Sequence, residues 1–221
     1  MFKIICDFDG VIAVTNVFVR LLEEFALSQW RVIEQDWLEG RISARERLSC
    51  QVALIRAHSY EMVRFCHNIE IDPTFPAFTE FCNARQFPIL VVSNGLDLLV
   101  QQALARRGLG HLLIIANQLK QRGEDHWQVT FPYRVTRCWR GTGVCQSTVT
   151  LTHTKPVVFI GDGRSDRCFV RQADLVLAKG SLVHYCLRHD IAHLAVDSFA
   201  DALLILQQLS SDSSIERVVY H

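Results

Sequence analysis

Two aspartates, one residue apart, follow the first apolar segment of the chain. The stretch IICDFDG, residues 4–10, places Asp7 and Asp9 directly after a short run of apolar residues. Removing an unpaired ion from water costs several kcal/mol, so two carboxylates at the end of a buried strand need a cation beside them. Carboxylates held in this way are suited to metal binding, nucleophilic attack and proton transfer.

Three further apolar segments end in polar residues in the same manner. Segment 89–92 is followed by SNG, segment 157–160 by GDGRSD, and segment 175–178 by Lys179 and Gly180. In open α/β sheets, ligands bind in the crevice outside the carboxyl ends of the strands. We therefore expect one site at this edge of the sheet, with its acidic side chains supplied by Asp7, Asp9, Asp162 and Asp166.

The order of the segments indicates the fold class. The apolar runs are continuous rather than alternating, which is typical of parallel strands buried on both faces. The first run covers residues 3–6, and another strand is expected at 113–116; helical patterns occupy 96–106, 166–173, 182–188 and 199–209. Such alternation of strands and helices predicts an α/β protein with a doubly wound parallel sheet.

One long segment interrupts this alternation. Residues 14–81 have helical patterns and no strand candidate, directly after the first strand. We interpret this segment as a small helical cap domain over the strand ends, and residues 1–13 and 82–221 as the core domain. Residues 118–133 resemble a polar hairpin, which leads into the irregular segment 136–148.

Composition excludes several classes of function. The 221-residue chain is 49% hydrophobic and 21% charged, and its 23 basic and 23 acidic residues give a formal net charge of zero. Neither nucleic acid nor a membrane surface is therefore expected as a partner. The chain has no apolar run of about 18 residues and no signal-peptide pattern, so a cytoplasmic location with reduced cysteines is expected.

The residue types at the strand ends point to phosphate chemistry. Oxygen ligands alone favour Mg²⁺, a hard cation that binds one or two carboxylates and phosphate oxygens. Ser93 and the backbone N–H groups of Asn94 and Gly95 are suited to hold a phosphate. Each feature taken singly has a simpler explanation as a turn or helix cap. Together they indicate phosphoryl transfer to an aspartate, assisted by a metal ion.

Three motifs carry a family resemblance. DFDGV, VVSNG and GDGRSD, in this order and each after an apolar strand, resemble the first, second and fourth motifs of the haloacid dehalogenase-like phosphatases. The chain is most similar to the branch that contains phosphoserine phosphatase and the 2-hydroxy-3-keto-5-methylthiopentenyl-1-phosphate phosphatase of methionine salvage. The resemblance implies a Mg²⁺-dependent phosphatase that hydrolyses a small phosphorylated metabolite through an aspartyl-phosphate intermediate.

The resemblance also implies a role for each motif residue. Asp7 corresponds to the nucleophile and to a Mg²⁺ ligand. Asp9 corresponds to the general acid/base, with its backbone carbonyl on the metal. Ser93 corresponds to the residue that binds the transferring phosphoryl group, next to Asn94 and Gly95. Asp162 completes the metal site, and Asp166 is a further ligand or orients one.

The third motif departs from the family pattern. A lysine normally bridges the nucleophile and the phosphate; in the methylthiopentenyl branch it follows cysteine in a Gly-x-Cys-Lys pattern, whereas residues 143–146 here read GVCQ. Gln146 donates a hydrogen bond but carries no charge, which weakens stabilisation of the transition state. Lys179, at a strand carboxyl end, is a candidate replacement. Lys155 lies at the opposite end of its strand, and Arg137, Arg140 and Arg164 are weaker candidates.

Three alternatives therefore stay open. The first is a phosphoserine phosphatase or a phosphotransferase that passes the group to an alcohol. The second is a catalytically weak phosphate-binding or regulatory protein, which the change to Gln146 favours. The third is a zinc site at Cys138 and Cys145 with His126 and His153, although this spacing fits a reduced loop pair better. Arg41, Arg45 and Arg47 are candidates for substrate contacts, but charges on helices usually face solvent.

Overall fold

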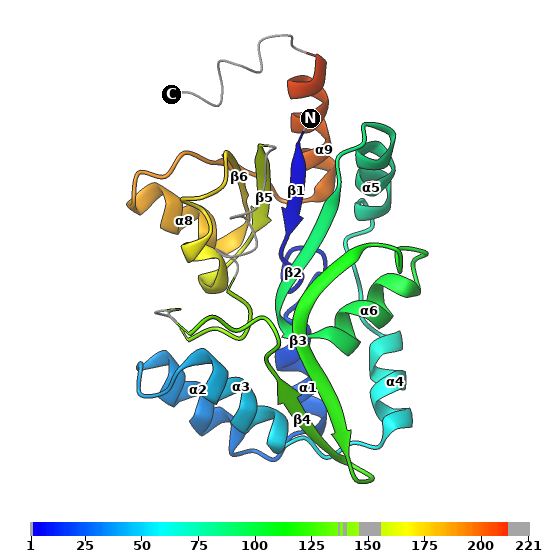
Figure 1. Ribbon diagram of the computed structural model, residues 1–221, viewed down its shortest axis with the longest axis vertical. Coiled ribbons are helices and arrows are strands. Elements are labelled where there is room, and N and C mark those ends of the chain that lie inside the picture. Colours follow the sequence, from blue (N-terminus) through cyan, green and yellow to red (C-terminus); the bar gives the residue numbers. More distant parts are fainter. Residues whose placement is uncertain (1, 137, 139–140, 146–155, 212–221) are drawn as a thin grey trace.

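A mixed sheet organises the described part of the chain. The computed structural model describes residues 2–136, 138, 141–145 and 156–211 (Figure 1). Seven strands lie in the order β4-β3-β2-β1-β5-β6-β7, and every neighbouring pair is parallel except β3 and β4. The strands are β1 (Lys3–Cys6), β2 (Ile89–Leu96), β3 (Leu113–Arg122), β4 (His126–Thr130), β5 (Val157–Gly161), β6 (Leu175–Ala178) and β7 (Leu194–Ala195). The chain winds outward from β1 in both directions, which confirms the predicted α/β class and doubly wound sheet.

Burial on both faces explains the continuous apolar runs. Ile4, Ile5 and Cys6 of β1 are all fully buried. Ile4 and Cys6 belong to the larger core cluster, whereas Ile5 points to the other face and joins the cluster around Phe159. Successive side chains of a strand point to opposite faces, so where both faces are covered, as at residues 4–6, consecutive residues are apolar.

Helices cover both faces and one end of the sheet (Figure 1). Between β1 and β2 the chain forms α1 (Val17–Phe25), α2 (Trp30–Leu38), α3 (Ala44–Ala53), α4 (Ser59–His67) and α5 (Phe75–Ala84); later helices are α6 (Asp97–Ala105), α8 (Gly180–Arg188) and α9 (Phe199–Ser211). We call α1–α4 the helical insertion. α5 instead packs on α9, with the ring of Phe199 4.6 Å from that of Phe75 and 5.0 Å from that of Phe78. The cap domain of residues 14–81 stays a prediction.

The helical insertion is bound to the β3–β4 hairpin and to the loop 141–145. Trp127 Nε1 on β4 donates to the carbonyl of Ala57 at 2.8 Å. The N–H of Arg45, in α3, donates to the carbonyl of Gly141 at 3.0 Å. Gly141 has a φ of +58°, and a Cβ there would lie 2.8 Å from Cβ of Ser43, so only glycine fits this contact. These contacts hold α2 and α3 beside the strand ends.

Two local predictions from the sequence differ from the structure. Residues 166–173 were expected to form a helix, but only a short 3₁₀ turn, η1 (Arg164–Cys168), is present. Asp166 closes this turn, because its Oδ2 accepts the N–H groups of Asp162 and Gly163 at 2.9 and 3.0 Å. Segment 89–92 was expected to end before the SNG turn, yet β2 continues to Leu96 with an irregular register. The predicted hairpin at 118–133 is confirmed by the antiparallel pairing of β3 with β4.

None of the helices in the described part of the chain has both the length and the apolarity that a membrane span needs.

Candidate active site

Three carboxylates meet where β1 and β5 end. Asp7 follows β1, Asp162 follows β5, and Asp166 lies in η1; their nearest oxygens are all within 4.8 Å of one another. The adjacency has a simple cause: β1 and β5 are parallel neighbours with Cys6 paired to Ile160, so the residues that follow both strands emerge together. The structure thus brings together three of the four acids that the sequence placed at this edge.

The electrostatics of this cluster call for a cation. Burial, followed by the charges of Asp166, Asp162 and Asp9, raises the pKa of Asp7 well above its ordinary range. Burial and the charges of Asp166 and Asp9 raise the pKa of Asp162 to about 7, with a smaller opposing effect from Lys179. The three side chains of this cluster offer carboxylate oxygens, a donor set that fits a hard divalent ion such as Mg²⁺. A bound cation would reverse these shifts and keep the acids ionised.

This arrangement predicts a pH-dependent effect of Mg²⁺ on stability. The raised pKa of Asp162 means that the folded protein holds a proton more tightly than the unfolded chain. Without metal, stability should therefore fall as pH rises from about 4, the ordinary value, to about 7. Mg²⁺ should restore it, so the increase in Tm on adding Mg²⁺ should be larger at pH 8 than at pH 5. Thermal unfolding at both pH values measures this; an equal increase at both would contradict the prediction.

Asp9 lies beside the cluster at the start of α1. Its Oδ1 accepts the N–H of Val17 at 2.7 Å, so the carboxylate caps the helix together with Asn16, whose Oδ1 accepts the N–H of Val19. Burial raises the pKa of Asp9 to about 6, against the opposing effects of the helix N–H groups and of Arg47. A carboxyl group with this pKa exchanges a proton readily near neutral pH, as a general acid/base must.

The SNG stretch, here called the SNG turn, lies in the irregular part of β2 next to Asp9. Ser93 is fully buried, and its Oγ accepts the N–H of Gly95 at 2.9 Å. A Cβ at Gly95 would lie 3.0 Å from both Asp9 Oδ2 and Ser93 Oγ, so a side chain there would crowd the site. Asn94 and Gly95 line the adjacent pocket. Asn94 and Gly95 therefore lie where a phosphate near Asp7 would contact them, whereas Ser93 is not among the described residues that line the pocket.

Lys179 lies near the loop that follows β1. It precedes α8, its Nζ is 3.5 Å from the carbonyl of Val11, and its charge opposes the raised pKa of Asp162. Lys179 is not among the described residues that line the pocket. Gln146 lies outside the described residues, as do Arg137, Arg140, His153 and Lys155, so the replacement of the usual lysine by Lys179 stays a prediction.

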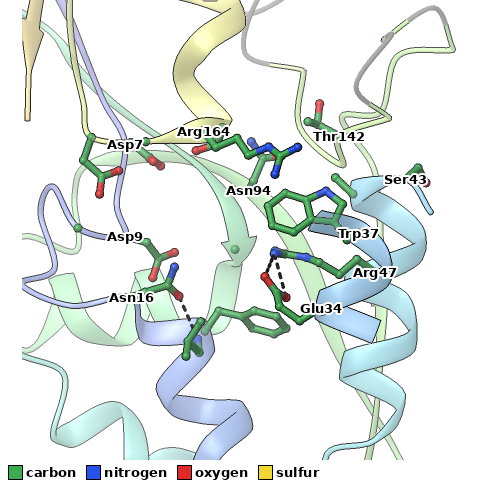
Figure 2. Close-up of a pocket in the computed structure, with 18 of the residues that line it drawn as sticks. Asp7, Asp9, Asn16, Glu34, Trp37, Ser43, Arg47, Asn94, Thr142 and Arg164 are labelled. Carbon is green, nitrogen blue, oxygen red and sulfur yellow. Dashed lines mark hydrogen bonds and ion pairs between the residues drawn. The ribbon is translucent and has the colours of Figure 1, made fainter. Parts of the chain in front are cut away.

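A pocket of about 960 Å³ extends from the carboxylates to the helical insertion. Figure 2 shows Asp7 and Asp9 on one side and Trp37 and Arg47 on the other, with Arg164 between them. The guanidinium groups of Arg47 and Arg164 lie 4.0 and 4.8 Å from the ring centre of Trp37. The apolar part of the lining comes from Val14, Phe18, Val19 and Ile42.

The role of Arg47 was underestimated from the sequence. Charged residues on helices usually face solvent, but Nη1 of Arg47 is held by both oxygens of Glu34, at 3.1 and 3.2 Å. Gln51, one turn later, is fully buried and donates to the same carboxylate at 2.9 Å. The available signal was that Arg47 and Gln51, four residues apart, share the face of α3 that also carries apolar residues.

Comparisons with known proteins agree with this geometry. The model of the haloacid dehalogenase-like hydrolase family matches residues 4–171. A 2-hydroxy-3-keto-5-methylthiopentenyl-1-phosphate phosphatase of Brevibacillus brevis is 27% identical over 213 residues, covering 94% of this chain and 96% of the relative. The enzyme of the same name from Geobacillus thermodenitrificans is 28% identical over 214 residues, covering 92% and 94%.

Solved structures show the same fold. Phosphoserine phosphatase from T. onnurineus in complex with NDSB-201 has a TM-score of 0.67 at 14% identity, over 92% of both chains. A probable phosphoserine phosphatase from Vibrio cholerae has a TM-score of 0.70 at 15% identity, over 94% of this chain and 64% of that one. The family match runs from β1 beyond η1 and so includes all three motifs recognised in the sequence. The chain belongs to the haloacid dehalogenase-like hydrolase family and is a phosphatase of that family.

Proposed function

We propose that the protein hydrolyses a small phosphomonoester by attack of Asp7 on phosphorus, with Mg²⁺ held by Asp7, Asp162 and Asp166. The observation that carries this proposal is the meeting of these three carboxylates within 4.8 Å at one end of a large pocket. When bound, the metal ion would offset negative charge on the transferring phosphoryl group. The backbone carbonyl of Asp9 is the further ligand that the family resemblance implies.

Asp7, Asp9 and Ser93 supply the nucleophile, the proton transfer and the binding of the phosphoryl group. Attack by the Asp7 carboxylate breaks the phosphorus–oxygen bond of the ester and gives an aspartyl-phosphate and an alcohol. Asp9, with its pKa of about 6, donates the proton that the leaving alkoxide needs. In the second step Asp9 accepts a proton from water, which attacks phosphorus and releases phosphate and the free Asp7 carboxylate. The Ser93 hydroxyl and the N–H of Asn94 bind the phosphoryl oxygens, while the N–H of Gly95 donates to Ser93 Oγ.

The pocket favours a substrate with an uncharged, partly apolar body. Its lining combines Phe18, Ile42 and Trp37 with three arginines. Two of them are already neutralised, Arg47 by Glu34 and Arg41 by Asp36 and Glu39. Two relatives are named for 2-hydroxy-3-keto-5-methylthiopentenyl-1-phosphate, which we propose as the substrate. Such a molecule has a thioether tail for the apolar wall and carbonyl and hydroxyl oxygens for the guanidinium groups.

Phosphoserine is the second candidate, because the structural neighbours are phosphoserine phosphatases and Arg164 is able to bind a carboxylate. Transfer of the phosphoryl group to an alcohol in place of water is a variant of the same chemistry. Comparison of kcat/KM for the two phosphomonoesters, with and without Mg²⁺, tests the assignment. A higher value for phosphoserine would overturn the proposed substrate and leave the reaction class intact.

Arg47→Met should separate substrate recognition from chemistry. A guanidinium hydrogen bond to a substrate oxygen is worth about 1.5–3 kcal/mol, so kcat/KM for the proposed substrate should fall about 10- to 100-fold. Hydrolysis of p-nitrophenyl phosphate, which lacks those oxygens, should change much less. The matched control is Arg31→Met, since Arg31 also stacks on a tryptophan of α2 but lies outside the pocket lining. Equal losses on both substrates would contradict a recognition role for Arg47.

A further inference from the structure

The SNG turn, residues 93–95, interrupts the hydrogen-bond ladder between β2 and β3. Between β2 and β3, Val92 pairs with Ile115 and Leu96 pairs with Asn117, so β2 advances four residues while β3 advances two. An irregularity of this kind leaves backbone groups of the longer strand without ladder partners. Buried backbone carbonyls need a donor from elsewhere. Asn94 and Gly95 lie in this interruption, so their carbonyls require such a donor.

The side chain of Asn117 supplies it. Asn117 is fully buried on β3, and its Nδ2 donates to the carbonyls of Asn94 and Gly95 at 2.8 and 3.1 Å. Two carbonyl oxygens at these distances require the amide nitrogen to face them. On the opposite side, a Cβ at Gly143 would lie only 2.1 Å from Asn117 Oδ1. The carboxamide therefore lies between the turn and Gly143, in space that only the absence of a Cβ at Gly143 leaves open, and its Oδ1 has no hydrogen-bond partner among the described residues.

The Asn94–Gly95 peptide group connects Asn117 to Ser93, because each of these side chains is hydrogen-bonded to one end of it. The carbonyl of Asn94 and the N–H of Gly95 belong to the same trans peptide and point in opposite directions. Because Asn117 holds the carbonyl, the N–H of Gly95 is directed at Ser93 Oγ, which accepts it at 2.9 Å. A hydroxyl that accepts this hydrogen bond must direct its own proton elsewhere.

We infer that Asn117 is a positioning residue, which holds the Asn94–Gly95 peptide so that the Ser93 hydroxyl donates its proton to the phosphoryl group. The inference rests on the proposed function, since it takes Ser93 as a phosphate ligand. Asn117 itself contacts no substrate in this arrangement and acts through the turn. The Asn94 side chain supports the same turn, because its Oδ1 accepts the N–H of Val144 at 3.2 Å.

A double-mutant cycle tests this dependence. Asn117→Leu removes both donated hydrogen bonds at similar volume, and Ser93→Ala removes the hydroxyl. A misplaced binding group costs on the order of 10²-fold, so we expect each single variant to lower kcat/KM about 10- to 100-fold. If Asn117 acts through Ser93, the double variant should be no worse than Ser93→Ala alone. If the loss of kcat/KM in the double variant equals the product of the losses in the two single variants, the inference is wrong.

Two further variants guard against a loss of folding. Asn117→Ser keeps one hydrogen-bond donor, so its kcat/KM should lie between those of wild type and Asn117→Leu. It replaces the leucine variant in the cycle if that variant does not fold. The matched structural control is Thr79→Val, which removes the hydrogen bond of a buried Thr79 hydroxyl to the carbonyl of Pro76. Thr79→Val should lower Tm with kcat/KM unchanged, and its effects should be independent of Ser93→Ala.

A binding measurement separates this inference from the proposed reaction. Titration calorimetry with inorganic phosphate, in the presence of Mg²⁺, measures the Kd of wild type, both single variants and the double variant. The same double-mutant cycle is thereby evaluated on binding, without any turnover. If wild type hydrolyses no phosphomonoester but binds phosphate, and the Kd cycle is non-additive, the reaction is wrong and the positioning role stands. If wild type is active but the variants of Asn117 keep wild-type Kd and kcat/KM, the positioning role is wrong.

Discussion

Asp7→Asn is expected to abolish turnover while leaving the fold intact. An amide oxygen is too weak a nucleophile to form the acyl phosphate, and loss of a nucleophile lowers kcat by more than about 10³-fold. Asparagine has the same shape, and its amide oxygen is able to keep the hydrogen bond that Asp7 Oδ1 accepts from the N–H of Phe8 at 2.8 Å. The change also removes one charge from three crowded carboxylates, so the variant should be more stable than wild type at pH 8 without Mg²⁺.

Phosphate release and thermal unfolding measure the two effects on the same preparations. The matched control is Asp174→Asn, since Asp174 accepts the N–H of Val157 at the amino end of β5, at the opposite edge of the sheet. This control should keep wild-type turnover, because it changes an acid to an amide outside the site. Equal residual rates in wild type and Asp7→Asn would show that Asp7 is not the nucleophile.

Asp9→Asn is expected to lower turnover in a way that depends on the leaving group. General acid–base catalysis contributes about 10²- to 10⁴-fold, so alkyl phosphates should be hydrolysed more slowly by a factor in this range. p-Nitrophenyl phosphate should be affected much less in its first step, because p-nitrophenolate leaves without a proton. The pKa of about 6 for Asp9 predicts that wild-type activity on alkyl phosphates falls as the acid loses its proton above that pH. The variant should lack this part of the pH profile.

Single-turnover rates on both substrates, measured across pH, distinguish proton transfer from a structural role. Asparagine is able to accept the hydrogen bond from the N–H of Val17, so the start of α1 should be preserved in the variant. An equal loss on alkyl and p-nitrophenyl phosphates, with an unchanged pH profile, would indicate that Asp9 supports the loop and does not transfer the proton. Circular dichroism of the variant checks that α1 and the rest of the helices are retained.

The core of the fold could be predicted because its signals are local. β1 and β6 have the predicted bounds, since continuous apolar runs that end in polar residues describe strands buried on both faces. The 3₁₀ turn at Arg164–Cys168 could not be predicted in this way. There the pattern of residues 166–173 suits a helix, but Asp166 turns back to the N–H groups that precede it. Likewise, the extension of β2 through the SNG turn depends on pairing with β3.

The sequence by itself determined which acids lie at the site. Asp7 and Asp162 directly follow apolar strands, and parallel strands of one sheet end at a common edge, so order along the chain was enough to bring them together. The positions of Asn117 and Arg47 at the site became evident only from the tertiary structure. Asn117 faces a gap in the β2–β3 ladder, and Arg47 meets Glu34 and Trp37 across two helices. Hydrogen bonds and stacking between elements depend on register and packing, which no local pattern encodes.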